Sequence, residues 1–329
     1  MRLPTRSLHQ YIPIAGALIL ASALAACGGG AGAGTPSATA ASDTIAGSAN
    51  LKGVNITVGS KEFTEQKVLG QILVQALKGT GATVKDQTGL TGTPVVRKAL
   101  ESGQIDMYYE YTGTGWINIL GNAKPVPGSD AQFTAVQGAD AKNKITWLAP
   151  AAANNTYAIA VNPQIAQKYS PKTISDYAKI VADHPDEAGL CSAAEFITRD
   201  DGLPGLEKAY GFNLPKDKVA TLDFGLVYAS VAKGQPCNFA VVFATDGQIL
   251  ANKLTVLTDD KGFFPAYNIA LTMRTDVYTA HKDAYDKLFG ELDKLLTTDQ
   301  MTQLNAAVDV DGKEPKQVAE DFLKKNKVI

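Results

Sequence analysis

Residues 54–79 read VNITVGSKEFTEQKVLGQILVQALKG, and this stretch indicates the fold class of the chain. Its first part, 54–60, is an alternating β-branched run ended by Gly-Ser, which predicts a strand. Thr64 then stands as a candidate N-cap with an acidic first turn, and apolar residues recur at helical spacing until Gly79. The stretch therefore predicts a strand followed by an amphipathic helix.

The same rhythm continues on both sides of this unit. Strands are predicted at 82–86 and 105–109 around a helix at 94–103, which indicates a parallel α/β layer. A second set follows, with strands at 157–161 and 239–243, a helix capped by Thr173, helices at 206–210 and 228–232, and amphipathic helices at 283–296 and 314–325. Because no fusion-like linker separates the two sets, we expect two lobes of one protein with a ligand cleft between them.

The amino-terminal residues 1–27 have the pattern of a lipoprotein signal peptide. Arg2 and Arg6 precede an apolar stretch that is short for the ~20 residues of a membrane span, and the stretch ends in Leu-Ala-Ala-Cys27. The alternative is an ordinary signal peptide with an incidental cysteine. Residues 28–50, rich in Gly, Ala, Ser and Thr, predict a flexible tether. We therefore expect an extracytoplasmic protein anchored to the cell membrane by a lipid on Cys27.

Composition limits the classes of function. The chain is 45% hydrophobic and 19% charged, and its formal charge of −2 becomes −4 without the two arginines of the signal peptide. No basic cluster is present, which argues against nucleic acid as a partner. There is no Gly-x-Ser-x-Gly elbow or phosphate-binding loop, and the only histidines outside the signal peptide are His184 and His281. We expect neither an enzyme nor a cofactor.

Two cysteines remain outside the signal peptide, Cys191 and Cys237. In an extracytoplasmic protein such a pair predicts a disulfide, with two buried free thiols as the alternative. Their spacing and the scarcity of histidine do not favour a metal site.

Aromatic residues gather beside turns at predicted strand ends. They occur at 108–116, at 154–157 and at 263–268, which are the positions where the chain should pass the cleft. Ring faces in a cleft can hold a quaternary ammonium group, with each contact contributing ~0.5–2 kcal/mol. The alternative for any one ring is a role in core packing.

Five stretches in series carry a resemblance to a known family: GSKEFTEQ (59–66), EYTGT (110–114), NTYA (155–158), EFITRDDGLPGL (195–206) and FATDG (243–247). They resemble the substrate-binding proteins of ABC importers for glycine betaine, choline and carnitine. The resemblance implies a two-lobed type II periplasmic-binding-protein fold with two crossover strands. It places the first lobe at 51–155 and 265–329 and the second lobe at 156–264.

The resemblance also implies roles for particular residues. An aromatic box around the quaternary ammonium is expected from Tyr111, Tyr157, Phe243 and Tyr267. A clamp on the substrate carboxylate is expected from Lys61, Thr114 and Arg199, with Asn155 as a polar wall residue. An arginine fork and a lysine charge suit a carboxylate, although surface ion pairs are the alternative for both. Phe243 and Asn155 depart from relatives that have a tyrosine and an acid there.

The sequence therefore predicts a lipid-anchored receptor that binds a quaternary ammonium osmoprotectant, glycine betaine first, and delivers it to ABC permease subunits. Two alternatives stay open. The ligand could be a polyamine or an amino acid, in which case Glu110, Asp201 and Asp246 should matter more than the rings. The chain could also be a secreted hydrolase, for which it offers few bases. A purely structural lipoprotein fits the tyrosine cluster least.

Overall fold

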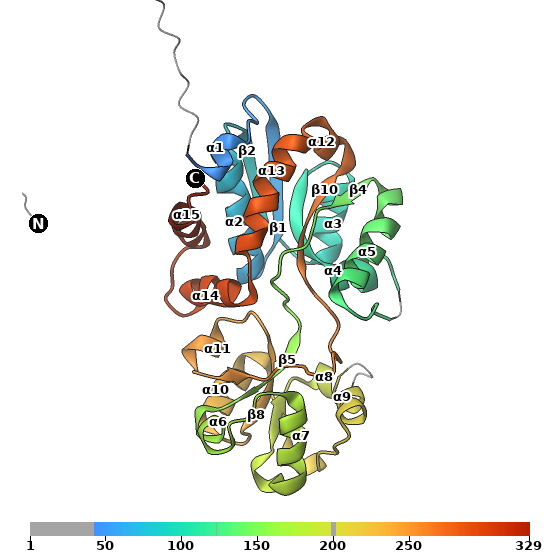
Figure 1. Cartoon of the computed structure of the whole chain (residues 1–329), viewed down its shortest axis with the longest axis vertical. Coiled ribbons are helices and arrows are strands. Elements are labelled where there is room, and N and C mark those ends of the chain that lie inside the picture. The colour runs from blue at the N-terminus through green and yellow to red at the C-terminus, as the bar shows by residue number, and fades with distance from the viewer. Residues whose placement is uncertain (1–42, 123, 199–201) are drawn as a thin grey trace, which may run out of the picture. The chain divides into compact units, whose positions relative to one another are not determined.

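The computed structural model describes residues 43–122, 124–198 and 202–329. Strands in these ranges form two sheets, with the orders β2-β1-β3-β10-β4 and β7-β6-β8-β5-β9. The first sheet contains β1 (Asn55–Lys61), β2 (Thr83–Leu90), β3 (Met107–Tyr111), β4 (Ile145–Trp147) and β10 (Ile269–Arg274). The second contains β5 (Tyr157–Val161), β6 (Leu190–Ser192), β7 (Val219–Thr221), β8 (Phe239–Phe243) and β9 (Thr255–Val256). We call each sheet with its covering helices the first and the second lobe (Figure 1).

Helices cover both faces of the first sheet. Its helical segments are α1 (Ile45–Ser48), α2 (Thr64–Gly79), α3 (Thr93–Glu101), α4 (Thr112–Thr114), η1 (Gly115–Ile119), α5 (Ser129–Asp140), η2 (Ala141–Asn143), α12 (Thr275–Ala280), α13 (Lys282–Leu292), η5 (Asp293–Leu295), α14 (Thr298–Asp309) and α15 (Pro315–Lys325). Strand β3 shows why: Met107, Tyr109 and Tyr111 join the core with α2, α13 and α15, whereas Tyr108 joins the core with α3 and α5. The strand alternation therefore supplies two apolar faces.

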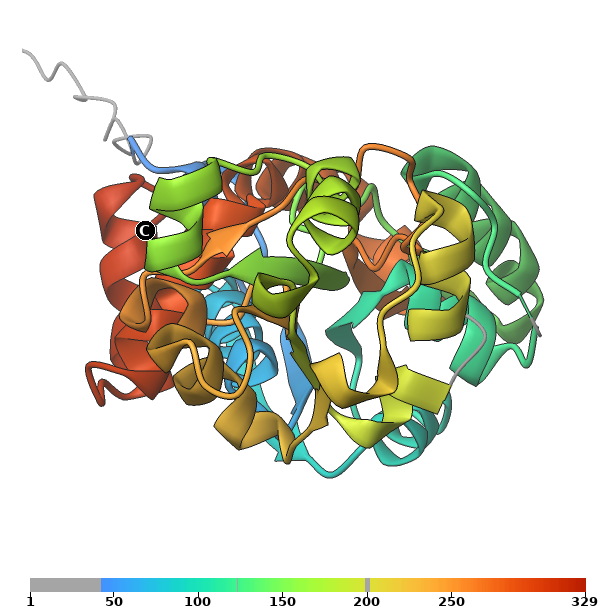
Figure 2. The same cartoon turned by 90° about the horizontal axis from the view of Figure 1, so that it is seen from below.

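The second lobe repeats this arrangement with its own helices. They are α6 (Pro163–Tyr169), α7 (Ile174–Asp183), η3 (Pro185–Glu187), α8 (Ala194–Thr198), α9 (Leu203–Tyr210), η4 (Lys216–Lys218), α10 (Phe224–Lys233) and α11 (Gln248–Ala251). Phe239 and Val241 of β8 pack with α7 and α9, and Val242 packs with α10 on the other face. Figure 2 shows this lobe from below. Within the described ranges, no helix has the length and apolarity needed to cross a bilayer.

Two segments, 148–156 and 257–268, carry the chain between the sheets, as the two predicted crossovers require (Figure 1). They lie against each other, because Asn154 pairs with Asn268 in an antiparallel bridge and Thr156 Oγ1 donates to the carbonyl oxygen of Pro265 at 2.7 Å. The chain re-enters the first sheet through β10, which runs antiparallel to β3 and β4. Strands β1, β2 and β3 are parallel, as predicted.

The amino-terminal boundary of the fold differs from the prediction. The predicted tether extended to residue 50, but α1 lies within it, and Ala46 and Ala49 are buried. The N–H group of Ala46 donates to the carbonyl oxygen of Val328 at 2.8 Å. Small side chains fit here because Gly79 leaves room for Ala46, so this part of the predicted tether belongs to the first lobe. Cys27 and the signal peptide lie outside the described residues.

The start of α2 also corrects a prediction. Phe63 is the N-cap residue, without a side-chain hydrogen bond, and Thr64 is already helical. The Thr64 hydroxyl instead donates to Asp309 Oδ1 at 2.6 Å, so it links α2 to the end of α14.

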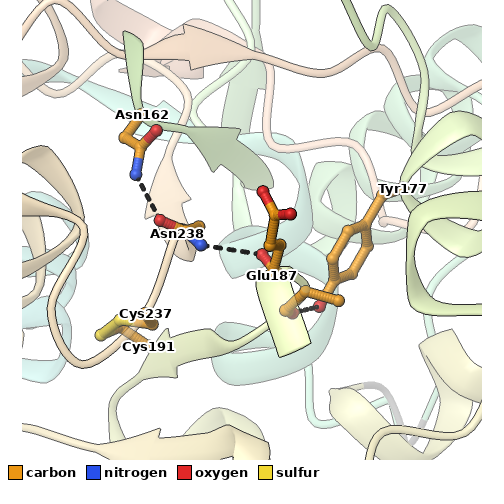
Figure 3. Close-up of a disulfide and its surroundings, with 7 residues drawn as sticks. Asn162, Tyr177, Glu187, Cys191, Cys237 and Asn238 are labelled. Carbon is orange, nitrogen blue, oxygen red and sulfur yellow. Dashed lines mark hydrogen bonds between the residues drawn. A yellow bond between two sulfur atoms is a disulfide. The ribbon is translucent and has the colours of Figure 1, made fainter. Parts of the chain in front are cut away.

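Cys191 and Cys237 form a disulfide, as predicted, with their Cα atoms 5.6 Å apart (Figure 3). Cys191 is in β6 and Cys237 precedes β8, its parallel neighbour. Hydrogen bonds from Asn162 Nδ2 to Asn238 Oδ1 and from Asn238 Nδ2 to the carbonyl oxygen of Glu187 lie nearby. The disulfide is buried and therefore ties β6 to the start of β8, its neighbour in the interior of the sheet.

Candidate functional site

A cavity of about 580 Å³ is lined by residues from both lobes and from the two crossing segments. This volume is in the range of small-molecule sites. Every predicted binding residue within the described part of the chain lines it: Lys61, Tyr111, Thr114, Asn155, Tyr157, Phe243 and Tyr267. Arg199, the remaining predicted residue, lies outside the described residues. The structure therefore brings together side chains that are up to some 200 positions apart in the sequence.

Strand pairing positions the rings of the second lobe. Tyr157 begins β5 and Phe243 ends β8, and the two residues are directly opposite in the antiparallel register. Their ring centroids are 5.1 Å apart at an interplanar angle of 26°. Both side chains are partly exposed, and both line the cavity. This stacked pair therefore forms part of the cavity wall.

The rings of the first lobe come from three different elements. Tyr111 ends β3, and Phe63, at the start of α2, stacks on it with centroids 6.3 Å apart. Tyr267 comes from the second crossing segment, and its ring packs closely against Gly113. A Cβ atom at Gly113 would lie 2.7 Å from that ring, so the glycine of the EYTGT stretch is needed to seat Tyr267. Sequence reasoning assigned no role to Phe63, although its side chain is 42% exposed in the cavity wall.

A buried carboxyl group, Glu65, joins the two lobes at the cavity. Its Oε1 accepts from the Tyr111 hydroxyl at 2.7 Å and from Asn155 Nδ2 at 3.1 Å, and its Oε2 accepts from Asn305 Nδ2 at 2.9 Å. The Thr245 side chain is a further hydrogen-bond partner. The pKa of Glu65 is raised overall, because the effect of burial exceeds that of these hydrogen bonds, which lower it. Sequence reasoning missed Glu65, Asn305 and Thr245.

Lys61 lines the cavity, but its charge already has a partner. Its Nζ atom lies 2.6 Å from Oε1 of Glu110, which is fully buried, and 5.2 Å from the Tyr111 ring centroid. The Glu110 carboxylate also accepts from the Tyr111 backbone N–H at 2.8 Å. The ion pair therefore fixes Lys61 beside the ring, and it compensates the lysine charge.

Other carboxylates line the cavity in addition to Glu65. They are Glu62, Asp246 and Asp309. Burial raises the pKa of Asp246, while the Gly92 backbone N–H lowers the pKa of Glu62. The charged side chains that line the described cavity are thus mostly acidic, which favours a ligand with a positively charged group.

The comparisons with known proteins agree with this geometry. A family model described as the substrate binding domain of the ABC-type glycine betaine transport system matches residues 54–325. A glycine-betaine-binding protein of Pseudomonas aeruginosa is 34% identical over 279 residues, which are 83% of this chain and 88% of that protein. The glycine betaine-binding protein YehZ of Escherichia coli is 36% identical over 282 residues, which are 82% of this chain and 90% of that protein.

Solved structures show the same fold. The apo structure of YehZ from Escherichia coli has a TM-score of 0.77 at 33% identity, and the match covers 84% of this chain and 99% of that chain. A crystal structure of a glycine betaine/carnitine/choline ABC transporter protein has a TM-score of 0.74 at 29% identity, with 83% and 98% covered. The predicted two-lobed type II periplasmic-binding-protein fold is therefore confirmed. The chain belongs to the family of substrate-binding proteins of glycine betaine-type ABC transporters, which are extracytoplasmic binding proteins and not enzymes.

Proposed function

We propose that this protein encloses a quaternary ammonium solute between Tyr111, Tyr157, Phe243 and Tyr267 and delivers it to an ABC permease. The observation that carries the proposal is that these four rings line one cavity from both lobes and a crossing segment. A methylated ammonium has no N–H to donate, so ring faces are its best partners, at ~0.5–2 kcal/mol each. Phe63, stacked on Tyr111, extends the same aromatic wall.

Glycine betaine is the first candidate solute, because the predicted clamp suits a carboxylate. Lys61 and Thr114 line the cavity with the rings, and Arg199 is proposed as the third member of the clamp. An ammonium has three donors, and the hydrogen bond from Lys61 to Glu110 uses one, so Lys61 can still donate to a ligand. The start of α2 at Thr64 adds the positive end of a helix dipole at the same place.

We also propose that the mature receptor is held at the membrane by a lipid on Cys27. The small residues before the cysteine and the Gly-, Ala-, Ser- and Thr-rich sequence after it support this proposal. The lobe boundaries are proposed at 155/156 and 264/265, next to the bridge between the crossing segments. Membrane fractionation of the full chain and of Cys27→Ala tests the anchor. We expect the wild-type protein in the membrane fraction, and equal partition of both proteins would contradict the proposal.

Calorimetric titration of the mature protein tests the binding function. Glycine betaine, choline, carnitine and proline betaine are titrated in turn, and thermal unfolding is followed with each. We expect heat and a raised melting temperature with at least one of them, because a ligand that binds only the folded state stabilises it. No heat and no thermal shift with any of the four would remove the proposal.

A small cation of the polyamine type is the second candidate, because Glu62, Asp246 and Asp309 line the cavity. Among the acids expected to matter for such a ligand, Glu110 forms an ion pair with Lys61, and Asp201 lies outside the described residues. Spermidine separates the two candidates. A polyamine donates N–H groups to carboxylates, so tighter binding of spermidine than of every quaternary ammonium would favour the second candidate.

A further inference from the structure

Glu65 is unusual among the cavity residues because it is both acidic and buried. Its side chain is in the first turn of α2, the residue is 4% exposed, and it lines the cavity beside Tyr111. Its hydrogen-bond partners come from the box, the first crossing segment, α14 and the second lobe. Burying a carboxyl group costs free energy because the group leaves water, and packing alone does not require a carboxylate at this position. A role in binding would explain why an acid is placed here.

Two asparagine side chains next to Glu65 present the NH2 ends of their amides, and not the oxygen ends, to its carboxyl group. Asn155 and Asn305 both turn their NH2 groups to Glu65, which is the arrangement that suits an ionised carboxylate, because such a group only accepts hydrogen bonds. Their Oδ1 atoms are left buried with no hydrogen-bond partner among the described residues. The donors fix the carboxylate, and the two amide oxygens add uncompensated negative ends close by. This part of the cavity is therefore incomplete without a positive group.

Lys61, the lysine that lines the cavity, does not supply the missing positive group beside Glu65. Lys61 is bonded to Glu110 at 2.6 Å, and the other charged side chains that line the described cavity are Glu62, Asp246 and Asp309. The Tyr111 hydroxyl that contacts Glu65 stays neutral, because burial raises the pKa of this tyrosine well above its ordinary value. Lys61, the one cation among the described residues that line the cavity, is thus paired with another acid, and a cationic ligand against Glu65 would favour its ionised form.

We propose that Glu65 is the counter-charge of the ligand's quaternary ammonium group and makes the cavity select a cation over a neutral group of the same shape. This inference rests on the proposed function, and it assigns recognition of the positive charge on the ligand to Glu65. Ring faces alone favour a cation modestly, whereas a desolvated carboxylate beside the rings adds a direct charge interaction. The hydroxyl of Tyr111 links the carboxylate to the aromatic box, because it donates a hydrogen bond to Glu65 while the ring of the same residue contacts the ligand.

The test compares two quaternary ammonium ligands with their carbon isosteres, in which the methylated centre carries no charge. Glycine betaine and choline are each titrated against the analogue in which a tert-butyl group replaces the trimethylammonium group. The wild-type protein and Glu65→Gln are used, with Glu291→Gln as the matched control on the exposed surface of α13. The glutamine can be accommodated, because a turn of the Asn155 amide offers its unpaired Oδ1 to the new NH2 group. Asn305 then keeps its hydrogen bonds to residue 65 and to the carbonyl oxygen of Thr245.

We expect Glu65→Gln to weaken binding of each quaternary ammonium ligand by about 10-fold and to leave the affinity for its carbon isostere unchanged. The control variant should behave as the wild-type protein. An unchanged ratio of cation to isostere affinity in a folded Glu65→Gln would overturn the inference. A wild-type protein that binds both members of a pair equally would overturn it without any variant, whereas a wild-type protein that binds no quaternary ammonium would overturn the proposed function itself.

Discussion

Replacing Gly247 by alanine tests the contact between the second lobe and α14. Gly247 is buried at the start of α11 and has φ −61° and ψ −24°, values that alanine adopts freely. The contact is with backbone, since a Cβ atom at Gly247 would lie 2.4 Å from the nitrogen and 2.6 Å from the Cα atom of Ala306. The residues on either side of this contact, Thr245 and Asn305, line the cavity.

The magnitude follows from these distances. Ordinary contact begins at 3.4 Å, so the two backbone segments must separate by about 1 Å. Overpacking of this kind costs about 1–3 kcal/mol. The hydrogen bond from Asn305 Nδ2 to the carbonyl oxygen of Thr245, 2.8 Å long, spans the same contact and must stretch with it. We therefore expect both a lower free energy of unfolding and a wider cavity with weaker ligand binding.

Urea denaturation of the ligand-free protein measures the first effect, and calorimetric titration with the best quaternary ammonium ligand measures the second. Gly290→Ala is the matched control, because Gly290 is an exposed residue in the last turn of α13, and no atom outside the local helix backbone lies within 4 Å of the position of its Cβ. There alanine should raise the free energy of unfolding by about 0.5–1 kcal/mol through its better helix propensity. A Gly247→Ala protein with wild-type stability and wild-type affinity would refute the reasoning.

Three further predictions concern single contacts. In calorimetric titration, Tyr111→Ala should weaken ligand binding by at least about 10-fold and Tyr111→Phe by about threefold or less, because phenylalanine keeps the ring; equal losses would assign the effect to the hydroxyl. Burial raises the pKa of Asp293 to about 7, above its ordinary 3.8, so the folded state loses stability as pH rises from about 4 to about 7. Asp293→Asn should remove this loss and gain up to about 4 kcal/mol at pH 8, measured by urea denaturation across pH; a constant difference between the proteins would contradict it. Replacing Cys191 and Cys237 by alanine opens a loop of 46 residues and should lower the free energy of unfolding by about 4 kcal/mol, whereas no change in the urea midpoint would rule out a stabilising disulfide.

Elements with strong local patterns were predictable from the sequence. Strands β5 and β8 are short apolar runs with clear ends, and their observed bounds, Tyr157–Val161 and Phe239–Phe243, equal the predicted ones. Helix α14 was missed because its buried face mixes Met301 and Leu304 with Thr302 and Asn305, so no apolar stripe stands out. Strand β10 was missed because its position depends on the chain returning to the first sheet, which is a tertiary event.

The site likewise contains some residues that were predictable from the sequence and others that were not. The tyrosines beside turns could be found because strand ends and crossing segments line a cleft in this fold class. The contact between Glu65 and Asn305 joins residues 240 positions apart, and no local pattern predicts it. The pairing of Lys61 with Glu110 was missed for the same reason, because the two residues meet only when β1 and β3 are neighbours in the sheet.

A crystal structure of the mature protein with bound glycine betaine or choline tests the central claim most directly. The account predicts a quaternary nitrogen within about 6 Å of the ring centroids of Tyr111, Tyr157, Phe243 and Tyr267. Ligand density outside this cavity, or inside it with the methylated nitrogen turned away from those rings, would contradict the account.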